Sequence, residues 1–272
     1  MIPSLLAKLV LALALAGQTA TADGSLQAGS AERLEFMKES VRGYEMTGSG
    51  GQPGALKLQP DPAFRLGKQG ADSLVDGAIF FWTTETGRPE IAIQVFLVKT
   101  VREPEGLWVH EFTSLSPAPV SATRNSRVAW APRQPGVEFR PVPGAGKPAD
   151  TPAQRQRQMH DLAQGFKASD NFHGKGWSEL RLLAKPIARY GKARSETLDG
   201  ALFAFVLGTD PEVFVFLEAR AGRDGLEWQY ALAPMTVFAV KAAYRETPVW
   251  SLPDRDPAND PVRPFFDTTY VP

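Results

Sequence analysis

The chain has 272 residues, 43% of them hydrophobic and 22% charged, which is typical of a globular protein and not of a disordered or fibrous one. Lys plus Arg and Asp plus Glu both number 30, so no excess charge attracts nucleic acid or an anionic membrane, and we expect no nucleic-acid partner. The absence of cysteine excludes disulfides, thiolate chemistry and cysteine-based zinc sites.

The first 22 residues have the pattern of a secretory signal peptide. Lys8 is the only early charge, an apolar run extends from Leu9 to Ala16, and small residues suitable for cleavage follow at Ala20–Ala22. The run is shorter than the ~20 apolar residues of a spanning helix, so we expect cleavage near Ala22 and no membrane span afterwards. The pattern predicts an exported protein, either periplasmic or extracellular.

Two stretches of the chain are nearly the same: LVDGAIFFW at 74–82 and TLDGALFAF at 197–205. Such self-similarity indicates an internal duplication. The similarity continues on both sides at nearly constant offsets. The matched positions include Arg33 with Arg155, Arg65 with Arg189, Asp76 with Asp199, Glu90 with Glu212, Trp108 with Trp228, and Trp130 with Trp250.

The duplication divides the chain into five predicted parts. They are a signal peptide (1–22), a first α+β repeat unit (23–132), a Pro/Gly-rich connector (133–150), a second α+β repeat unit (151–253) and an extended Pro-rich C-terminal tail (254–272). Each unit is predicted to be a helix followed by an antiparallel β-meander of about five strands, because turn residues separate successive strand-like runs by short connections. The predicted fold class is α+β with two tandem pseudo-symmetric repeats.

The helix starts are marked by capping residues. Thr151 is the expected N-cap of the second helix, with Pro152 in the first turn and Gln154 completing a capping box. In the first unit Ser30 is the expected N-cap, and Glu32 lies in the first turn, where the helix dipole favours an acid.

The predicted strands differ in how much of them is apolar. AIFFW, ALFAF and VFVFL are continuously apolar, so these strands should be covered on both faces. LEWQYALA alternates instead and places Trp228, Tyr230 and Leu232 on one face. The sequence leaves open whether the two sheets pack on each other or each covers its own helix.

The stretch WVHEFTSLS, residues 108–116, is a polar cluster inside a predicted strand. His110 and Glu111 are adjacent, so they point to opposite faces and cannot form a simple dyad. The second unit has Tyr230 and Ala231 at these positions, so His110 is a position at which one unit could have gained a function that the other lacks. The main expectation is a structural histidine bonded to a neighbouring strand or loop.

The candidate catalytic residues are therefore His110, Glu111 and Ser114. A serine nucleophile, Ser114 or Ser116, could use His110 as its base and a distant acid such as Asp76, although the chain lacks a GxSxG elbow. Asp76 and Asp199 both precede glycine, which favours a role in turns over a role as acids.

The sequence predicts neither a cofactor nor a metal ion. His160 falls on a predicted solvated helix face and His173 in a Gly-rich joint, and neither has the spacing of a metal ligand. Glu90 and Glu212 could form a glycosidase carboxylate pair, but their equivalent places after proline favour structure. No GxGxxG motif or Walker loop offers a phosphate cradle.

The tail carries three apolar anchors, Phe265, Phe266 and Tyr270. They predict a strap packed against its own domain, or alternatively a peptide that engages another chain. Together with Trp108 and His110 they are the candidate binding residues.

Several stretches, namely LRLLAKPIARY, LDGALFAFVLGTDPEVFVFLEAR, LEWQYALAPMT and PGVEFRPVPGA, resemble an uncharacterised family of exported bacterial proteins found largely in planctomycete-type genomes. The resemblance covers most of the mature chain and implies export and one recurrent architecture. It transfers no catalytic residue.

These observations favour a non-enzymatic binding or structural module of the cell envelope. Its partner is unknown and could be a protein or another envelope component. The alternatives are a cofactor-free hydrolase with His110 as general base, or a small-ligand carrier with a site between the two repeats.

Overall fold

The computed structural model describes residues 29–48, 56–67, 74–99, 103–192, 195–222, 225–255 and 259–270. The predicted signal peptide lies outside these residues. The described part contains helices and antiparallel sheets, so the fold is α+β as expected. Its helices are α1 (Ser30–Arg42), α2 (Pro152–Gln164) and the short 3-10 helix η3 (Phe172–Gly174).

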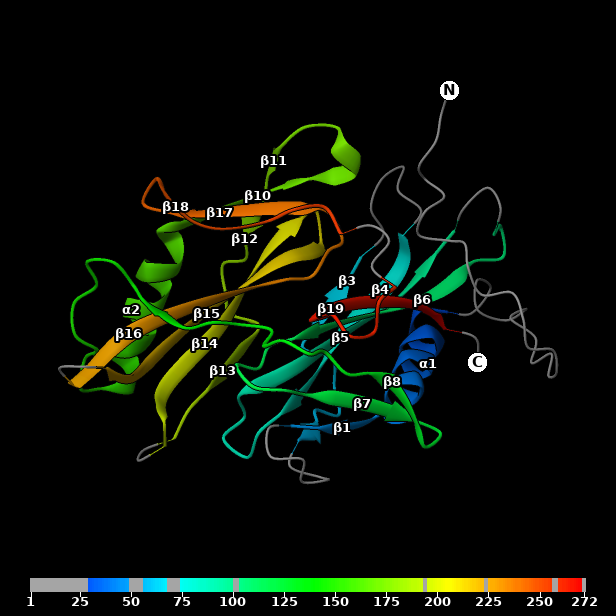
Figure 1. Ribbon diagram of the computed structural model, residues 1–272, viewed down its shortest axis with the longest axis horizontal. Helices are drawn as coiled ribbons and strands as arrows, with labels where there is room; N and C mark the ends of the chain where they lie inside the picture. The colour runs from blue at the N-terminus through cyan, green and yellow to red at the C-terminus, as the bar shows by residue number, and fades with distance from the viewer. Residues whose placement is uncertain are drawn as a thin grey trace.

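Two six-stranded sheets form the centre of the molecule (Figure 1). The first has the order β19 (Phe265–Tyr270), β6 (Leu107–Ser114), β5 (Pro89–Val98), β4 (Leu74–Thr83), β2 (Lys57–Leu58), with β3 (Phe64–Leu66) also paired to β4. The second has the order β12 (Arg181–Leu182), β14 (Thr197–Leu207), β15 (Asp210–Gly222), β16 (Gly225–Pro234), β9 (Arg140–Pro141), with β13 (Ala188–Tyr190) also paired to β14. In each sheet the three long strands are consecutive in the chain and form a meander.

Two smaller sheets hold the remaining strands. One has the order β1 (Glu45–Thr47), β7 (Ser121–Arg124), β8 (Arg127–Trp130), and the other β11 (Ser178–Glu179), β10 (Phe166–Asn171), β17 (Ala239–Tyr244), β18 (Thr247–Leu252). The expected five-stranded meander is therefore divided between a large and a small sheet in each half. Prolines stand at both divisions: Pro117 and Pro119 follow β6, and Pro234 ends β16. Proline has no backbone N–H to donate to a neighbouring strand, so it interrupts the sheet there.

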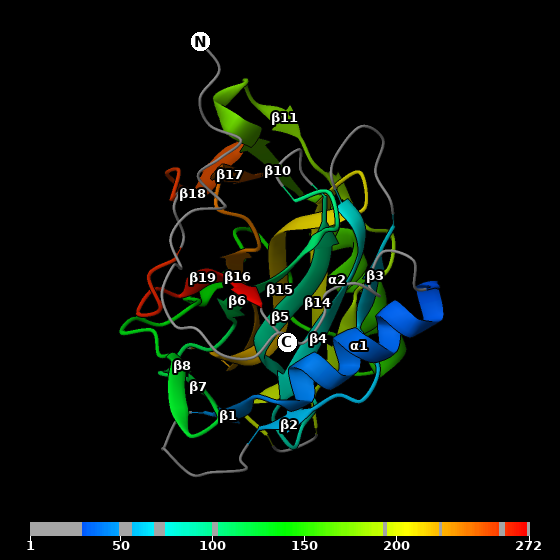
Figure 2. The ribbon, with the colours of Figure 1, turned by 90° about the vertical axis from the view of Figure 1, so that its right-hand side faces the viewer.

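The connector and the tail each supply an edge strand to one of the two large sheets. In both cases the strand joins the sheet of the half that does not directly precede it in the chain. We call residues 29–130 the first half and residues 152–252 the second half. Strand β9, which follows the first half, pairs with β16 of the second. Strand β19, which follows the second half, pairs with β6 of the first and lies beside it in both views (Figures 1 and 2). This exchange covers two sheet edges that would otherwise be open to aggregation.

The central sheets pack on each other and also on their own helices, so both arrangements left open by the sequence occur. One core lies between α1, the first large sheet and the β1-β7-β8 sheet, and a second lies at the corresponding place around α2. A third core lies between the two large sheets; its larger side chains include Ile79, Phe81, Phe96, Leu202, Phe214 and Phe216. Figure 1 shows the resulting layers, with α1 and α2 on opposite outer sides.

The burial of the long strands follows from their sequences. Strands β4, β14 and β15, which contain the apolar runs, are buried at nearly every position. In β16 the alternation is confirmed, because Trp228, Tyr230 and Leu232 face the α2 core while Ala231 and Ala233 face the core between the sheets.

The two helix starts differ from each other. The Thr151 cap of α2 is confirmed, since its Oγ1 accepts a hydrogen bond from the Gln154 N–H at 3.3 Å. The prediction of Ser30 as the cap of α1 is wrong: Gly29 occupies the N-cap, and the Glu32 carboxylate accepts its N–H at 2.7 Å. Ser30 is already helical, and its hydroxyl accepts instead from Arg65.

Neither α1 nor α2, the long helices of the described ranges, has the length and hydropathy to cross a membrane.

Candidate functional site

His110 is fully buried in the middle of β6, on the face that packs toward α1. Its Nδ1 is hydrogen-bonded to the Tyr44 hydroxyl at 2.9 Å, and the Arg124 guanidinium lies over the Tyr44 ring, 4.7 Å from its centroid. Burial, together with the nearby charge of Arg124, lowers the pKa of His110 to about 3. The imidazole is therefore neutral over the ordinary pH range.

The other two catalytic candidates do not meet His110. Ser114 lies four residues further along the same strand, about 13 Å away at the usual rise of ~3.3 Å per residue. Its Oγ accepts a long bond of 3.4 Å from the Ser116 N–H. Glu111 points to the opposite face, where it lies across from Gln94 on β5 and Asp267 on β19.

The second half fills the corresponding place with aromatic rings. Tyr230 is the counterpart of His110, and the Phe166 ring lies 5.2 Å from it and 4.7 Å from the Tyr244 ring, centroid to centroid. The polar trio of Tyr44, His110 and Arg124 is thus a variant of a packing arrangement that the chain also builds without a histidine.

Asp76 is not in a turn, contrary to the prediction, but inside β4, where it binds two arginines. Its carboxylate accepts from Arg33 of α1 at 2.8 Å and from Arg65 of β3 at 2.8 and 2.7 Å. Burial alone would raise its pKa, but the hydrogen bonds and charges of Arg65 and Arg33 hold it below the ordinary value of 3.8. The carboxylate therefore stays ionised and ties α1 to the sheet.

The same cluster occurs in the second half. Asp199, inside β14 and not in a turn, accepts from Arg155 of α2 at 3.0 Å and from Arg189 of β13 at 3.2 and 3.1 Å. These six residues are three of the pairs matched in the repeat. Both predicted turn aspartates are ion-pair anchors of a helix.

A third charged cluster joins the halves and was missed from the sequence. Glu218 on β15 is fully buried, and its carboxylate accepts from Arg88 Nε at 2.8 Å. It also accepts from the hydroxyls of Tyr190 and Thr197, at 2.6 and 2.9 Å, and from Arg220 at 3.2 Å.

Arg88 reaches this cluster from the start of β5, in the first half. Its Nη1 donates to Glu90 at 2.5 Å, and its guanidinium lies 4.8 Å from the Phe216 ring centroid. Although burial opposes it, the charges of Glu218 and Glu90 raise the Arg88 pKa, so the arginine stays charged. Glu90 itself lies in β5 and not in a turn, and Arg88 neutralises it.

A signal for this cluster was present in the repeat. Glu218 lies opposite Gly200 and Phe96 lies opposite Gly77, so the two residues hold equivalent positions. A glutamate that replaces a buried phenylalanine needs partners inside the protein. Comparing the sequences of the two halves does not identify those partners, because Arg88 comes from the other half.

The predicted binding residues lie largely inside the molecule. Phe265 and Phe266 are buried, Phe265 beside Phe238 and Phe266 in the α1 core. Trp108 is also buried, with its ring 4.5 Å from that of Phe36, centroid to centroid. Tyr270 lies opposite Trp108 in the ladder.

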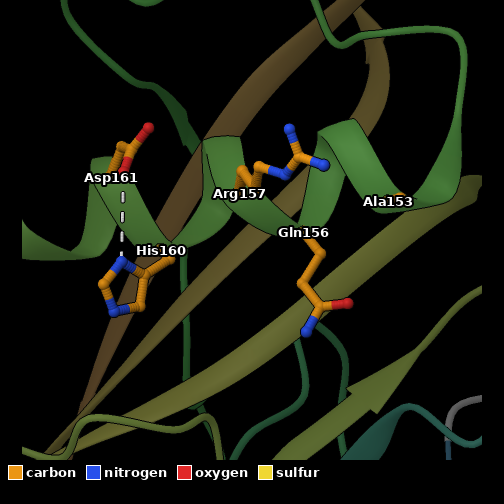
Figure 3. A pocket seen from close by; sticks show the side chains of 5 residues that line it. All are labelled: Ala153, Gln156, Arg157, His160 and Asp161. Atoms are coloured by element: carbon orange, nitrogen blue, oxygen red, sulfur yellow. Dashed lines mark ion pairs between the residues drawn. The ribbon is translucent and has the colours of Figure 1, made fainter.

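The outer surface of α2 carries a shallow hollow (Figure 3). It is lined by Ala153, Gln156, Arg157, His160 and Asp161, and His160 Nδ1 lies 3.9 Å from the Asp161 carboxylate. The side chain of Asp161 is largely exposed and that of His160 about half exposed, so this hollow has the solvated character expected of the helix face. Within the described ranges no group of three or more His, Asp or Glu side chains could hold a metal ion.

Comparison of the chain with protein-family models, with curated proteins and with solved structures finds no match. What its geometry offers is three buried charge clusters, centred on Asp76, Asp199 and Glu218, in which arginines pair with each carboxylate.

Proposed function

We propose that this chain is an exported, non-enzymatic binding or structural module of the cell envelope, built from two copies of one α+β unit. The observation that carries the proposal is the enclosure of His110: the only histidine predicted to act as a base has no exposed surface and is bonded to Tyr44. A general base must be within hydrogen-bond reach of the proton that it removes from a substrate.

The proposal of a duplicated unit is supported by contacts that recur in pairs. The Gly67 N–H donates to Thr209 Oγ1 at 3.1 Å, and the matching glycine, Gly191, donates to the Thr86 carbonyl at 3.4 Å. Each contact joins a loop of one half to the β-hairpin turn of the other. Such reciprocity is expected where two similar units face each other across a pseudo-twofold axis.

The small-ligand carrier is the less favoured alternative. It would need an apolar cavity between the two large sheets, and binding cavities usually measure hundreds of cubic ångströms. The described side chains between the sheets are nearly all buried against each other; Ile79, Phe214 and Phe216, for example, have no exposed surface. This packing favours a solid interface over a binding cavity.

A hydrolase screen tests the proposal directly. The chain is incubated with p-nitrophenyl esters, phosphates and glycosides, beside His110→Gln, Ser114→Ala and the exposed-histidine control His160→Gln. We expect no turnover above the level shared by all four proteins. Turnover that His110→Gln and Ser114→Ala abolish and His160→Gln retains would overturn the proposal in favour of the hydrolase.

A further inference from the structure

Trp177 is a large aromatic side chain that remains exposed, with 48% of its surface accessible. It lies between η3 and β11, and the loop that carries it extends past the body of the protein in both views (Figures 1 and 2). Lys241 Nζ, on β17, lies 4.0 Å from the indole centroid. The indole is thus held over the outer face of the β11-β10-β17-β18 sheet.

The loop that presents Trp177 is fixed to the sheet. Asn171 Oδ1 accepts the Gly176 N–H at 2.9 Å, and the Phe172 ring lies 4.7 Å from that of Phe238, centroid to centroid. Gly176 has a φ of 113°, which side-chain-bearing residues rarely adopt. A pinned loop presents the indole at little cost in conformational entropy when a ligand binds.

A row of hydrogen-bonding side chains crosses the sheet beside Trp177. In register across neighbouring strands lie Glu179, Ser169, Lys241 and Ser251. Neighbouring strands are about 4.8 Å apart, so these four groups are spaced evenly over about 14 Å. Alternate residues of the same strands, such as Ala168 and Val240, are buried, which places the row on the outer face.

The groups of this row are available to a ligand. Glu179, Lys241 and Ser251 are exposed, and Ser169 is partly so. Within the described part of the chain, the hydroxyls of Ser169 and Ser251 have no hydrogen-bond partner. The row contains one anion and one cation, so it selects neither a strongly acidic nor a strongly basic ligand.

We infer that this outer face binds a neutral polysaccharide. The apolar side of a sugar ring would stack on the exposed indole face, and its hydroxyls would exchange hydrogen bonds with the serines, Glu179 and Lys241. A neutral chain matches a row without net charge, and its many hydroxyls match a row of separate donors and acceptors. The inference deepens the proposed binding function and depends on it.

Affinity electrophoresis in native gels tests the inference, with dextran, soluble starch, hydroxyethyl cellulose, mixed-linkage β-glucan and galactomannan as the polysaccharides. We expect at least one of them to retard the full chain. Trp177→Ala should weaken that retardation at least tenfold, and Trp177→Phe, which keeps an aromatic face, should weaken it less. The matched control is Val128→Ala, which truncates a 70% exposed side chain on the first half and should leave the retardation unchanged.

Several results would overturn the sugar site. They are no retardation by any of the five polysaccharides, equal retardation of the wild type and Trp177→Ala, or retardation by charged polysaccharides alone. A change in molar mass of Trp177→Ala in light scattering would assign this face to self-association instead. None of these results involves turnover, so they are distinguishable from the hydrolase activity that would overturn the proposed function.

Discussion

Asp170 is a carboxylic acid buried without a partner. It lies on β10 with no exposed surface, and neither carboxylate oxygen has a hydrogen-bond partner on any other described residue. Burial raises its pKa from 3.8 to about 6, even though a bond to its own backbone opposes the rise. For His110 burial moves the pKa in the opposite direction: it lowers the pKa, because the neutral form of a histidine is the base.

Replacing Asp170 by Asn should stabilise the protein at neutral pH. The folded-state pKa is raised, so the carboxyl favours folding below pH 4, and this contribution is lost as the pH rises to about 6. Above pH 6 the wild type keeps a buried charge that Asp170→Asn lacks, and we expect the variant to gain about 1–3 kcal/mol. The measurement is urea unfolding of both proteins at pH 4 and pH 8.

The exposed Asp161 provides the control for this comparison. Asp161→Asn should change the free energy of unfolding by less than about 0.5 kcal/mol at either pH. An Asp170→Asn variant with the same advantage at pH 4 as at pH 8, or with none at pH 8, would contradict the assignment of a buried, ionising carboxylate.

At the level of elements, the helices are held by Arg–Asp–Arg clusters as well as by apolar packing. The sequence identified all six residues of the two clusters as repeat positions, but assigned the aspartates to turns. Asp-Gly is a common turn pair, and local propensity cannot indicate that Arg33, more than forty positions away, neutralises Asp76. The cap of α2 could be predicted because Thr151 acts through a local contact, whereas Ser30 lost its predicted role to the neighbouring Gly29.

Truncating Asp76 should loosen α1. Asp76→Ala leaves Arg33 and Arg65 close together without their shared anion, and we expect a loss of about 2–4 kcal/mol in the free energy of unfolding. Urea denaturation provides the measurement. The matched control is Asp61→Ala, whose carboxylate pairs with Lys38 at an exposed site and should cost less than about 1 kcal/mol. Equal costs for the two variants would show that the cluster is not an anchor.

At the level of the whole molecule, the two halves share a core, a buried charge cluster and two exchanged strands. The apolar runs predicted strands covered on both faces, and this much of the interface was readable from the sequence. The exchange of β9 and β19 was not, because β9 contains only two residues and edge pairing depends on which sheet edge lies nearby in the fold. The role of Arg88 was hidden for the same reason, since its partner Glu218 lies in the other half.

Differential scanning calorimetry of the full chain tests most directly the central claim that the buried polar groups and exchanged strands join two units into one body. We expect a single transition whose calorimetric and van't Hoff enthalpies agree, because neither half keeps its covered sheet without the other. Two separable transitions, each with the enthalpy of about half the chain, would contradict it.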